Sequence, residues 1–473
     1  MTLVKRQIGY LEAFRTTQRI RRMNREDLEK LQRSRLEKVF LHAKYYSGFY
    51  QTKYTHLAGC PSLQEIPPVA KQELMANFDE WVTDRDVKLD DLKKYISSQD
   101  NIGRPYRRKY LVSTTSGSTG HPAIILLDHN GQGVIDALAV TRSIAYKGTM
   151  WKLVKAGGKS AAIYATTGHY FGVASVRNKQ IKNPLKAKQF TVLSAQMPIE
   201  DIVRKLNEFK PSLLGGYPTA LELLIPEKLS GRLKISPVLI NTGGEHLSKD
   251  LAAKLSDVFQ CKVQSGYSCT EGGLIAFQCH FGRLHVNEDW VILEPVDQNG
   301  NAVAKGTLSD KVYLTNLANY VQPIIRYEVT DRIREYPDKC PCGSPLMSIE
   351  VEGRTDDMLV FADGDVKILP LSVYVVLKEI PGVVRFQVIQ RSNEIIELRL
   401  ETAGDRASDR NSDRESDRNS DQESDRESVC NQAIERLKSF FADHHVAPEI
   451  VLSENMPTAE SSGKFKHVSR SNR

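Results

Sequence analysis

The sequence predicts an α/β fold in which a large N-terminal domain with mixed sheets is followed by a small α+β C-terminal domain. The chain has 473 residues, which is more than one hydrophobic core usually organises. Between about residues 111 and 335, short apolar runs alternate with helical segments, as they do in strand–turn–helix units. Beyond residue 353 the pattern changes to strands followed by a helix. We therefore expect a large domain over residues 1–353 and a small one over 354–473.

The predicted elements follow in order along the chain. Residues 1–110 have a mainly helical pattern that is interrupted at Pro67 and Pro68. In the large domain, strands are predicted by AIILL, SAAIYA, FTVLSA, SLLGGY and PVLINTGGE, and helices by IEDIVRKLNEF, ALELLI and SKDLAAKLSDVF. Glycines recur at the ends of these strands, where ligands bind in folds of this type. In the small domain, strands are predicted by RFQVIQ and IIELRLE, and a helix by NQAIERLKSFFADHH.

A repetitive segment, DRASDRNSDRESDRNSDQESDRES, interrupts the small domain at residues 405–428. Its four-residue period of Ser-Asp-Arg type contains no apolar residue larger than Ala407. Burial is therefore too small to offset the entropy lost on ordering. We expect a disordered surface insertion between a strand and a helix.

Composition and charge disfavour several classes of protein. The 65 Lys and Arg against 58 Asp and Glu give a net charge of +7, too mild to indicate nucleic acid as a partner. The seven cysteines lack the even, regular spacing of a disulfide framework, which favours a reducing compartment. The chain has no run of about 18 apolar residues, and its charged N-terminal stretch lacks the apolar core of a signal peptide. We expect a cytoplasmic protein with no nucleic acid and no membrane as partner.

A stretch rich in Ser, Thr and Gly, from Ser113 to Gly120, lies between two apolar runs. Backbone N–H groups of a glycine-rich turn, together with hydroxyls, can surround phosphate oxygens at low steric cost. The phosphate loop of Walker-type ATPases requires G-x-x-x-x-G-K-[ST], which neither this stretch nor the run GGKS at Gly157–Ser160 satisfies. The sequence thus favours a phosphate site of another kind.

The stretch STTSGSTGHP resembles the signature loop of adenylate-forming enzymes, and five further stretches follow in the order of that superfamily. NTGGEHL resembles its adenine-binding turn, GYSCTEGG its aromatic-x-x-Thr-Glu motif, IIRYEVTDR its ribose-binding segment, VEGRTDDML its hinge region and PTAESSGKFK its Ser-Gly-Lys motif. The segment PPVAKQEL, the cysteine pattern and Ala123 in place of a lysine point to the phenylacetate-CoA ligase group, which includes the coenzyme F390 synthetases. Ser268 departs from the glycine of many superfamily members.

The resemblance implies an ATP-dependent ligase that converts a carboxylic acid to acyl-AMP with release of pyrophosphate and then transfers the acyl group to the thiol of CoA. Glu271 would hold Mg²⁺ and Lys464 would be catalytic, between the substrate carboxylate and the α-phosphate. The C-terminal domain would be mobile and turn about the hinge residue Asp356 between the two half-reactions. The residues implied in ATP binding are Lys71, Ser116, Gly117, Ser118, Thr119, Gly120, Gly243, Gly244, Glu245, Tyr267, Thr270, Asp331 and Arg354.

Candidate residues for the acyl pocket follow two predicted strands. They are His169, Phe171 and Gly172 in TTGHYFGVASV and Tyr217 in LLGGYPTAL. Aromatic walls suit an aryl or arylacetic acid, although core packing explains these aromatic residues equally well.

The cysteines form a second constellation. Cys279 and His285 are spaced C-x5-H, and Cys340 and Cys342 are spaced C-x-C, which together give the donor set of a tetrahedral zinc site. The resemblance implies that this zinc is structural and joins two loops of the large domain. His280 is an alternative ligand, and the alternative to a zinc site is a group of buried free thiols.

Other functions stay open at this point. The acceptor of the acyl group could be an amine or the thiol of a carrier protein instead of CoA, or AMP could be transferred to a hydroxyl. A zinc-stabilised scaffold that binds nucleotide without turnover is the non-catalytic alternative. The expected partners are a carboxylic acid, ATP and CoA or a carrier-protein thiol, with a homodimer also open.

Overall fold

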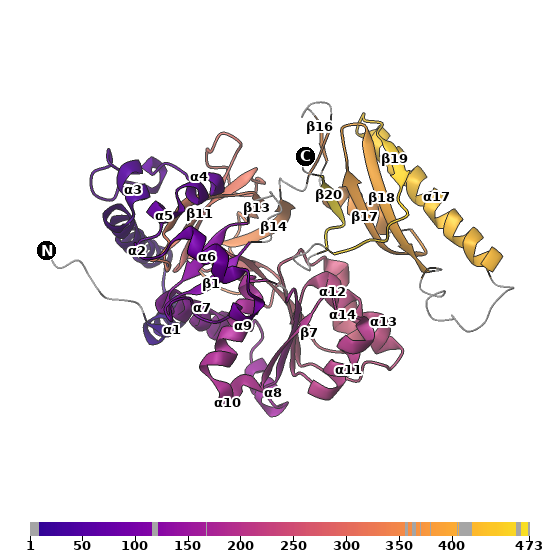
Figure 1. The fold of residues 1–473 in the computed structure, drawn as a ribbon, viewed down its shortest axis with the longest axis horizontal. Helices are drawn as coiled ribbons and strands as arrows, with labels where there is room; N and C mark the ends of the chain where they lie inside the picture. The colour runs from indigo at the N-terminus through magenta and orange to yellow at the C-terminus, as the bar shows by residue number, and fades with distance from the viewer. Residues whose placement is uncertain are drawn as a thin grey trace. The chain divides into compact units, whose positions relative to one another are not determined.

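The computed structural model describes residues 9–115, 122–166, 168–354, 358–361, 366–368, 370–378, 380–403, 405, 419–459 and 465–471. The chain divides into two compact units, and the boundary falls between Val351 and Glu352. The sequence placed the domain boundary two residues later, at 353/354. The fold class predicted from the sequence, mixed α/β with a second α+β unit, is confirmed (Figure 1).

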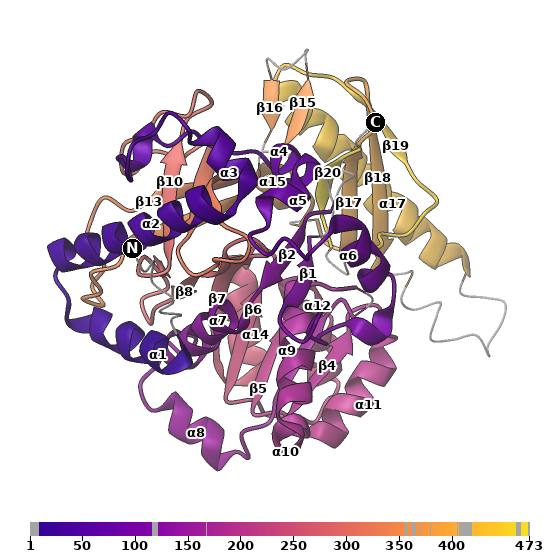
Figure 2. The same ribbon diagram turned by 60° about the vertical axis from the view of Figure 1, so that its left-hand side comes forward.

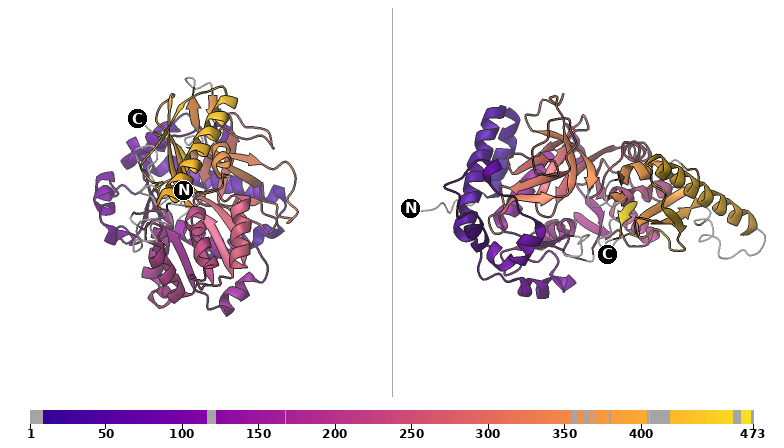
Figure 3. Two further views of the ribbon diagram at one scale, coloured as in Figure 1. Left: turned by 90° about the vertical axis from the view of Figure 1, so that its right-hand side faces the viewer. Right: turned by 90° about the horizontal axis from the view of Figure 1, so that it is seen from above.

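The first unit begins with a helical layer. Its helices are α1 (Tyr10–Arg19), α2 (Arg25–Tyr46), α3 (Gly48–Lys53), α4 (Lys71–Ala76), α5 (Phe78–Trp81) and α6 (Leu89–Ile96). Figures 1 and 3 both show α2–α5 beside the strands β10 (Val291–Val296), β11 (Lys311–Asn316) and β12 (Ile324–Val329). The Tyr50 hydroxyl and the Trp81 indole N–H both donate hydrogen bonds to the carbonyl of Pro323, at 3.2 and 2.6 Å. Buried polar groups of α3 and α5 are thus satisfied by the segment that leads into β12.

Helix α2 is also tied to the sheet by buried charges at the turn VNEDW, residues 286–290. Arg25 forms an ion pair with Glu288 at 2.8 Å, and Arg35 lies over the ring of Trp290 at 3.4 Å from its centroid. Burial lowers the pKa of Arg35 to about 10, although the nearby Asp289 opposes that shift. Because a buried charge without a partner is costly, these pairs fix the helical layer against the sheet.

A nine-stranded sheet forms the centre of the first unit, in the order β13-β14-β9-β8-β7-β6-β5-β3-β4. The five strands from β4 to β7 are parallel, and β7, β8, β9 and β14 are antiparallel. The strands are β3 (Ser160–Tyr164), β4 (Phe190–Ser194), β5 (Leu213–Gly216), β6 (Leu239–Gly243), β7 (Lys262–Cys269), β8 (Gly273–Gln278), β9 (Leu284–Val286), β13 (Asp331–Glu335) and β14 (Ser348–Arg354). The apolar runs that predicted β3, β4, β5 and β6 all form strands.

Helices cover both faces of the parallel part (Figure 2). One face carries α11 (Ile199–Phe209), α12 (Pro218–Glu222), α13 (Leu224–Leu229) and α14 (Lys249–Phe259), and the other carries α7 (His129–Arg142), α9 (Phe171–Lys182) and the hairpin β1 (Leu111–Thr114)–β2 (Ile124–Leu127). The amphipathic pattern of α11 explains its packing, because Ile202, Val203 and Leu206 are the residues that it buries. Two shorter helices, α8 (Thr149–Lys155) and α10 (Pro184–Ala187), precede β3 and β4.

The second unit is a four-stranded sheet of order β19-β18-β17-β20, with a two-stranded hairpin, β15-β16. Its elements are β15 (Leu359–Phe361), β16 (Val366–Ile368), α15 (Pro370–Lys378), β17 (Val383–Gln390), β18 (Ile395–Thr402), α17 (Asn419–Asp443), β19 (Glu449–Leu452) and β20 (Val468–Arg470). Leu377 of α15 and Leu437 of α17 belong to the core that they share with Val388 and Leu398 of the sheet. The unit is α+β, as its sequence pattern predicts.

The repetitive segment differs from its prediction in one part. Residues 406–418 lie outside the described residues, but the expectation of disorder is wrong for 419–428, which belong to α17. Arg426, in this part of α17, forms an ion pair with Asp405, just beyond the end of β18, at 3.0 Å. None of the described helices combines the length and the apolar character needed to cross a bilayer.

Candidate active site

The carboxyl ends of the parallel strands gather most of the described residues that the sequence assigned to a nucleotide site. Strand β6 ends at Gly243, paired with Gly266 of β7, and β5 ends at Gly216, paired with Thr242. Gly244 adopts a φ of 84°, a left-handed conformation that favours glycine, and it turns the chain away from β6. Ligands of open α/β sheets bind at this edge, where the glycine turn lies.

Two carboxylates beyond this edge are held by tyrosine hydroxyls. The Tyr327 hydroxyl of β12 donates to Oε1 of Glu271 at 2.8 Å, and the Tyr267 hydroxyl of β7 donates to Oδ2 of Asp331 at 2.5 Å. The pKa of the Cys269 thiol is raised well above its ordinary value. Burial is the largest cause, the negative charge of Glu271 is the next, and that of Asp331 contributes less. Both acids therefore lie close to one thiol, although 60 residues separate them in the sequence.

The N-terminal layer reaches the same place through Val69. The Val69 N–H donates to the carbonyl of Arg326 at 3.0 Å, and the Val69 carbonyl accepts from the N–H of Glu328 at 2.9 Å. Val69 and Tyr327 thereby form an isolated parallel β-bridge. Lys71 begins α4 two residues later. The backbone of Lys71 is thus brought near the tyrosine that holds Glu271.

The hairpin β1-β2 carries the proposed phosphate loop. Its last described residues are closed by two hydrogen bonds, from Thr115 N to the Ala123 carbonyl at 3.0 Å and from Ala123 N to Thr115 Oγ1 at 2.8 Å. Leu111 and Leu127 pack with Leu274, in the strand that follows Glu271. The two hydrogen bonds therefore hold both ends of the loop together, whereas Leu111 and Leu127 pair at the opposite end of the hairpin.

Some predicted residues cannot be placed. Ser116, Gly117, Ser118, Thr119, Gly120, Asp356 and Lys464 lie outside the described residues. Arg354 is the last residue of β14, and only its backbone is described. Thr270 lies between the end of β7 and Glu271 and is half-buried.

Glu245 has its carboxylate engaged within the chain. Its Oε2 accepts from Thr219, from the hydroxyl at 2.7 Å and from the backbone N–H at 3.2 Å. This contact joins the turn after β6 to the start of α12, which begins next to Tyr217. In the described geometry, the carboxylate of Glu245 thus links two loops at the carboxyl edge of the sheet.

An aromatic pair lies at the ends of β3 and β5. Tyr164 and Tyr217 meet edge to face with 5.0 Å between ring centroids, and Tyr164 also approaches Gly172, where an added Cβ would lie 3.7 Å from its ring. Burial, with a smaller part from Glu245, raises the pKa of Tyr164 to about 12, so its hydroxyl is neutral at physiological pH. Sequence reasoning missed Tyr164, although its place at the end of the predicted strand SAAIYA is a signal.

The other two acyl-pocket candidates have different surroundings. His169 is buried, with Nε2 3.3 Å from the carbonyl of Ser98 and its ring 5.8 Å from that of Tyr95. Phe171 is half-buried at the start of α9 and packs against the apolar core between α7 and α9. The structure therefore groups Tyr217 and Gly172 around Tyr164, while His169 contacts the N-terminal layer.

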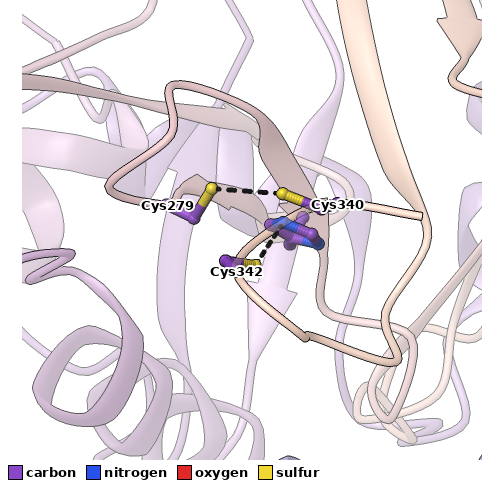
Figure 4. Close-up of side chains that lie close together, drawn as sticks. Cys279, Cys340 and Cys342 are labelled. Carbon is purple, nitrogen blue, oxygen red and sulfur yellow. Dashed lines mark hydrogen bonds between the residues drawn. The ribbon is translucent and has the colours of Figure 1, made fainter. Parts of the chain in front are cut away.

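The predicted metal ligands come together near the turn between β8 and β9. Cys279, His285, Cys340 and Cys342 place one donor atom each within 4.8 Å of all the others (Figure 4). Cys279 and His285 belong to the β8–β9 hairpin, and the two other cysteines belong to the loop between β13 and β14. An ion pair of 2.7 Å between Arg283 and Asp338 joins the same two segments. His280 is not among the four.

The geometry of this cluster fits a tetrahedral ion. Sγ of Cys279 lies 3.7 Å from Sγ of Cys340, and Sγ of Cys342 lies 3.3 Å from Nε2 of His285. Two sulfurs bound tetrahedrally to zinc at 2.3 Å lie about 3.8 Å apart, whereas a disulfide bond is near 2 Å. Nδ1 of His285 lies 3.1 Å from the carbonyl of Leu346, which leaves Nε2 free of its proton for a metal. Burial lowers the pKa of His285, which favours the neutral ring that binds metals.

Comparison with families of known proteins matches residues 33–301 to the AMP-binding enzymes. Among curated proteins, Protein CapK of Staphylococcus aureus is 22% identical over 364 residues, which are 72% of this chain and 70% of that protein. The matched family segment includes the hairpin loop, the turn after β6 and the Glu271 motif.

Solved structures share the fold over 75% to 96% of the chain. A 2-hydroxyisobutyryl-CoA ligase in complex with an acyl-AMP has a TM-score of 0.67 and 17% identity, over 96% of this chain and 91% of that one. Fatty acyl-adenylate ligases from E. coli and L. pneumophila have a TM-score of 0.52 and 14% identity, over 75% of this chain and 67% of theirs. At these identities the comparison establishes the fold.

Proposed function

The chain belongs to the AMP-binding enzyme family, and on this premise we propose that it activates a carboxylic acid with ATP and transfers the resulting acyl group to the thiol of CoA. In the first step a carboxylate oxygen bonds to the α-phosphorus, and the bond to pyrophosphate breaks. In the second step the thiol sulfur bonds to the acyl carbon, AMP leaves and the thiol loses its proton. The CoA ligase among the structural neighbours supports thiol transfer as the second step.

The observation that carries this proposal is the pairing of two carboxylates with tyrosine hydroxyls beyond the carboxyl edge of the sheet. Glu271, fixed by Tyr327, is suited to hold Mg²⁺, a hard cation that prefers carboxylate oxygens and neutralises phosphate charge. Asp331, fixed by Tyr267, is suited to accept the ribose hydroxyls of the nucleotide. The turn at Gly243 and Gly244 would receive the adenine, and the loop between β1 and β2 the β- and γ-phosphates.

The orientation of these groups is the contribution of the chain to the reaction. A fixed carboxylate needs no reorganisation when charge develops, which is the basis of electrostatic catalysis. Lys464 would add a positive charge between the substrate carboxylate and the α-phosphate, and Lys71 and Arg354 would contact the phosphates and the ribose. Asp356 would be the hinge of the C-terminal unit between the two steps.

The acid is proposed to be aryl or arylacetic. The edge-to-face pair of Tyr164 and Tyr217 lies at the carboxyl ends of β3 and β5, next to the glycine turn of β6. Gly172 leaves room beside Tyr164, because it has no side chain to fill that side of the ring. An aromatic ring could stack against such a surface.

Pyrophosphate release tests the function directly. The purified chain is expected to release pyrophosphate from ATP and Mg²⁺ when a carboxylic acid is present, with benzoate or phenylacetate above short aliphatic and fatty acids. Hydroxylamine should trap the acyl-AMP as a hydroxamate, and CoA should increase turnover by releasing AMP. ATP binding without pyrophosphate from any acid would instead indicate a nucleotide-binding scaffold. Turnover that a carrier-protein thiol or an amine increases, and CoA does not, would reassign the acceptor.

The proposal includes a structural zinc ion held by Cys279, His285, Cys340 and Cys342. Four protein donors complete a tetrahedral site and leave no position open for a substrate. Zinc would join the β8–β9 hairpin to the loop before β14 and so support the strands on either side of the Glu271 motif.

Metal analysis tests this site. The purified protein is expected to contain about one zinc per chain, and Cys342→Ser should lower that content well below one and lower the Tm by about 5 °C. The matched control is Cys60→Ser, which changes a half-buried free cysteine of the N-terminal layer and should keep both zinc and Tm. Wild-type protein with only traces of zinc would refute the site.

A further inference from the structure

The charge of the chain is unevenly distributed along the sequence. Residues 137–199 contain ten Lys and Arg and no Asp or Glu, although the whole chain has a net charge of only +7. This segment includes α8, α9 and α10 together with the strands β3 and β4. A large part of the excess positive charge therefore belongs to one contiguous part of the fold.

Helix α8 presents apolar side chains to solvent within this basic segment. Trp151 is 73% exposed and Val154 59%, and Met150 is also exposed, while α8 buries only Thr149 and Leu153. The lysines Lys147, Lys152 and Lys155 are exposed on and beside the same helix. A tryptophan exposed to this extent is unusual, because the large apolar area of the indole ring is mostly buried in folded proteins.

Helix α10 adds a second set of such side chains at the same edge of the sheet. Leu185 is 94% exposed and Ile181, at the end of α9, 46%. Strands β3 and β4 are parallel and in register from Ser160 and Phe190, so the segments that lead from α8 and from α10 enter the sheet side by side. Figures 1 and 2 both show α8 and α10 at the lower end of the first unit. Lys182 and Lys188 flank Leu185 and are exposed.

We propose that this face, made by α8, the end of α9 and α10, docks the protein on the surface of an anionic lipid bilayer. Trp151, Val154 and Leu185 would enter the boundary between headgroups and acyl chains, and the surrounding lysines would contact anionic headgroups. Lysine stems cover apolar surface while their ammonium groups reach outward, so the two kinds of side chain act together. The sequence expectation of no membrane partner rests on the lack of a spanning segment, whereas this face would lie on the bilayer.

Charge complementarity favours a bilayer over the other occupants. A second copy of the chain would bring the same lysines against each other across a two-fold interface, which is unfavourable. Nucleic acid would pair with the lysines but offers no apolar surface to Leu185 and Val154. The face also lies at the start of β3 and β4, about 16 Å from the carboxyl edge of those five-residue strands. Docking there leaves the candidate active site accessible, and the inference does not depend on the proposed function.

Tryptophan fluorescence of the full chain tests the proposal. Of the three tryptophans, all of which the structure describes, Trp81 and Trp290 are 1% exposed and Trp151 alone faces solvent. Vesicles of phosphatidylcholine with phosphatidylglycerol should shift the Trp151 emission to shorter wavelength, protect it from acrylamide and carry the protein into the vesicle pellet. Vesicles of phosphatidylcholine alone should have little effect, and higher salt should weaken the binding.

Variants separate the two components of the face. Trp151→Phe should remove the spectral shift while most of the protein still sediments with anionic vesicles. Lys152→Ala with Lys155→Ala should weaken vesicle binding about 30-fold, since each lysine near an anionic surface contributes a factor of about five. The matched control is Lys249→Ala with Lys254→Ala, which removes two exposed lysines from α14 on the other face of the sheet.

Three results would overturn the proposal. The first is equal binding to neutral and anionic vesicles, or none to either at low salt. The second is a Trp151 shift that depends on protein concentration without lipid, which would assign the face to a second copy. The third is binding to double-stranded DNA or to an acidic carrier protein in the absence of vesicle binding.

Discussion

Glu271→Gln is expected to lower the rate of acid-dependent pyrophosphate release on the order of 100- to 1000-fold, about 3–4 kcal/mol of activation free energy. The amide has nearly the same shape as the carboxylate and can still accept the hydrogen bond from Tyr327. It has no negative charge, so it binds Mg²⁺ poorly, and the repulsion between the acid and the triphosphate is no longer offset. Initial rates over a range of Mg²⁺ concentrations measure the effect, and excess Mg²⁺ should restore part of the activity.

Tyr327→Phe is the matched control, because it removes the hydroxyl that orients Glu271 and keeps the charge. A loss of about tenfold is expected, the usual scale for one hydrogen bond to a charged group. Tyr327 is buried, so thermal unfolding must show that the variant keeps its fold. Equal activity of Glu271→Gln and the wild type, in protein with an unchanged Tm, would contradict the assignment of Glu271.

The sequence predicted the parallel part of the fold well for a physical reason. Strands β3, β5 and β6 are short apolar runs bounded by glycine or by a helix signal, and α11 and α14, which follow β4 and β6, have an apolar pattern of helical period. Glycines at the carboxyl ends of such strands mark the ligand edge, which follows from topology. The turn at Gly243–Gly244 was therefore predictable from the chain alone.

The pairings within the site were not predictable. The hydrogen bond from Tyr267 to Asp331 joins residues 64 positions apart, and the one from Tyr327 to Glu271 joins residues 56 positions apart. Tyr267 and Tyr327 belong to different sheets, and no local sequence pattern encodes how these sheets meet. Likewise, His169 lies in the same sequence stretch as the other pocket candidates Phe171 and Gly172, but it contacts Ser98 of the N-terminal layer. Tertiary packing decides these contacts, and a periodicity of apolar residues contains no information on them.

The cysteine cluster was predictable from the sequence only in part. The ligand types and the number of donors were readable from the sequence, but the separation of 61 residues between Cys279 and Cys340 gave no guide to distance. Antiparallel pairing of β9 with β14, with Ser348 opposite His285, brings the two loops together. The helical start of α17 within the repeat was missed because composition predicts only the lack of burial. This start is continuous with later turns of α17 that bury Cys430, Ala433 and Leu437, and extending an existing helix costs less than starting one.

Lys464→Ala is expected to abolish acyl-AMP formation and to spare thioester formation from supplied acyl-AMP. The acid and ATP are both anions, and the approach of the carboxylate to the α-phosphorus requires a positive charge between them. Loss of such a charge should cost about 3 kcal/mol or more of activation free energy, which is at least about 100-fold in rate. In the second half-reaction the phosphoryl chemistry is complete, and the thiol attacks an acyl carbon where this ammonium has no part.

The two half-reactions therefore have to be measured separately in the same preparations. Acid-dependent pyrophosphate release reports the first, and formation of acyl-CoA from synthetic acyl-AMP reports the second. Lys438→Ala is the matched control, because Lys438 is an exposed lysine of α17 whose ion pair with Glu435 contributes little. Equal losses in both half-reactions would contradict the catalytic assignment of Lys464. A selective loss of the first, together with the Mg²⁺-dependent loss in Glu271→Gln, would place both charges around the same α-phosphate, since only that step brings two anions together.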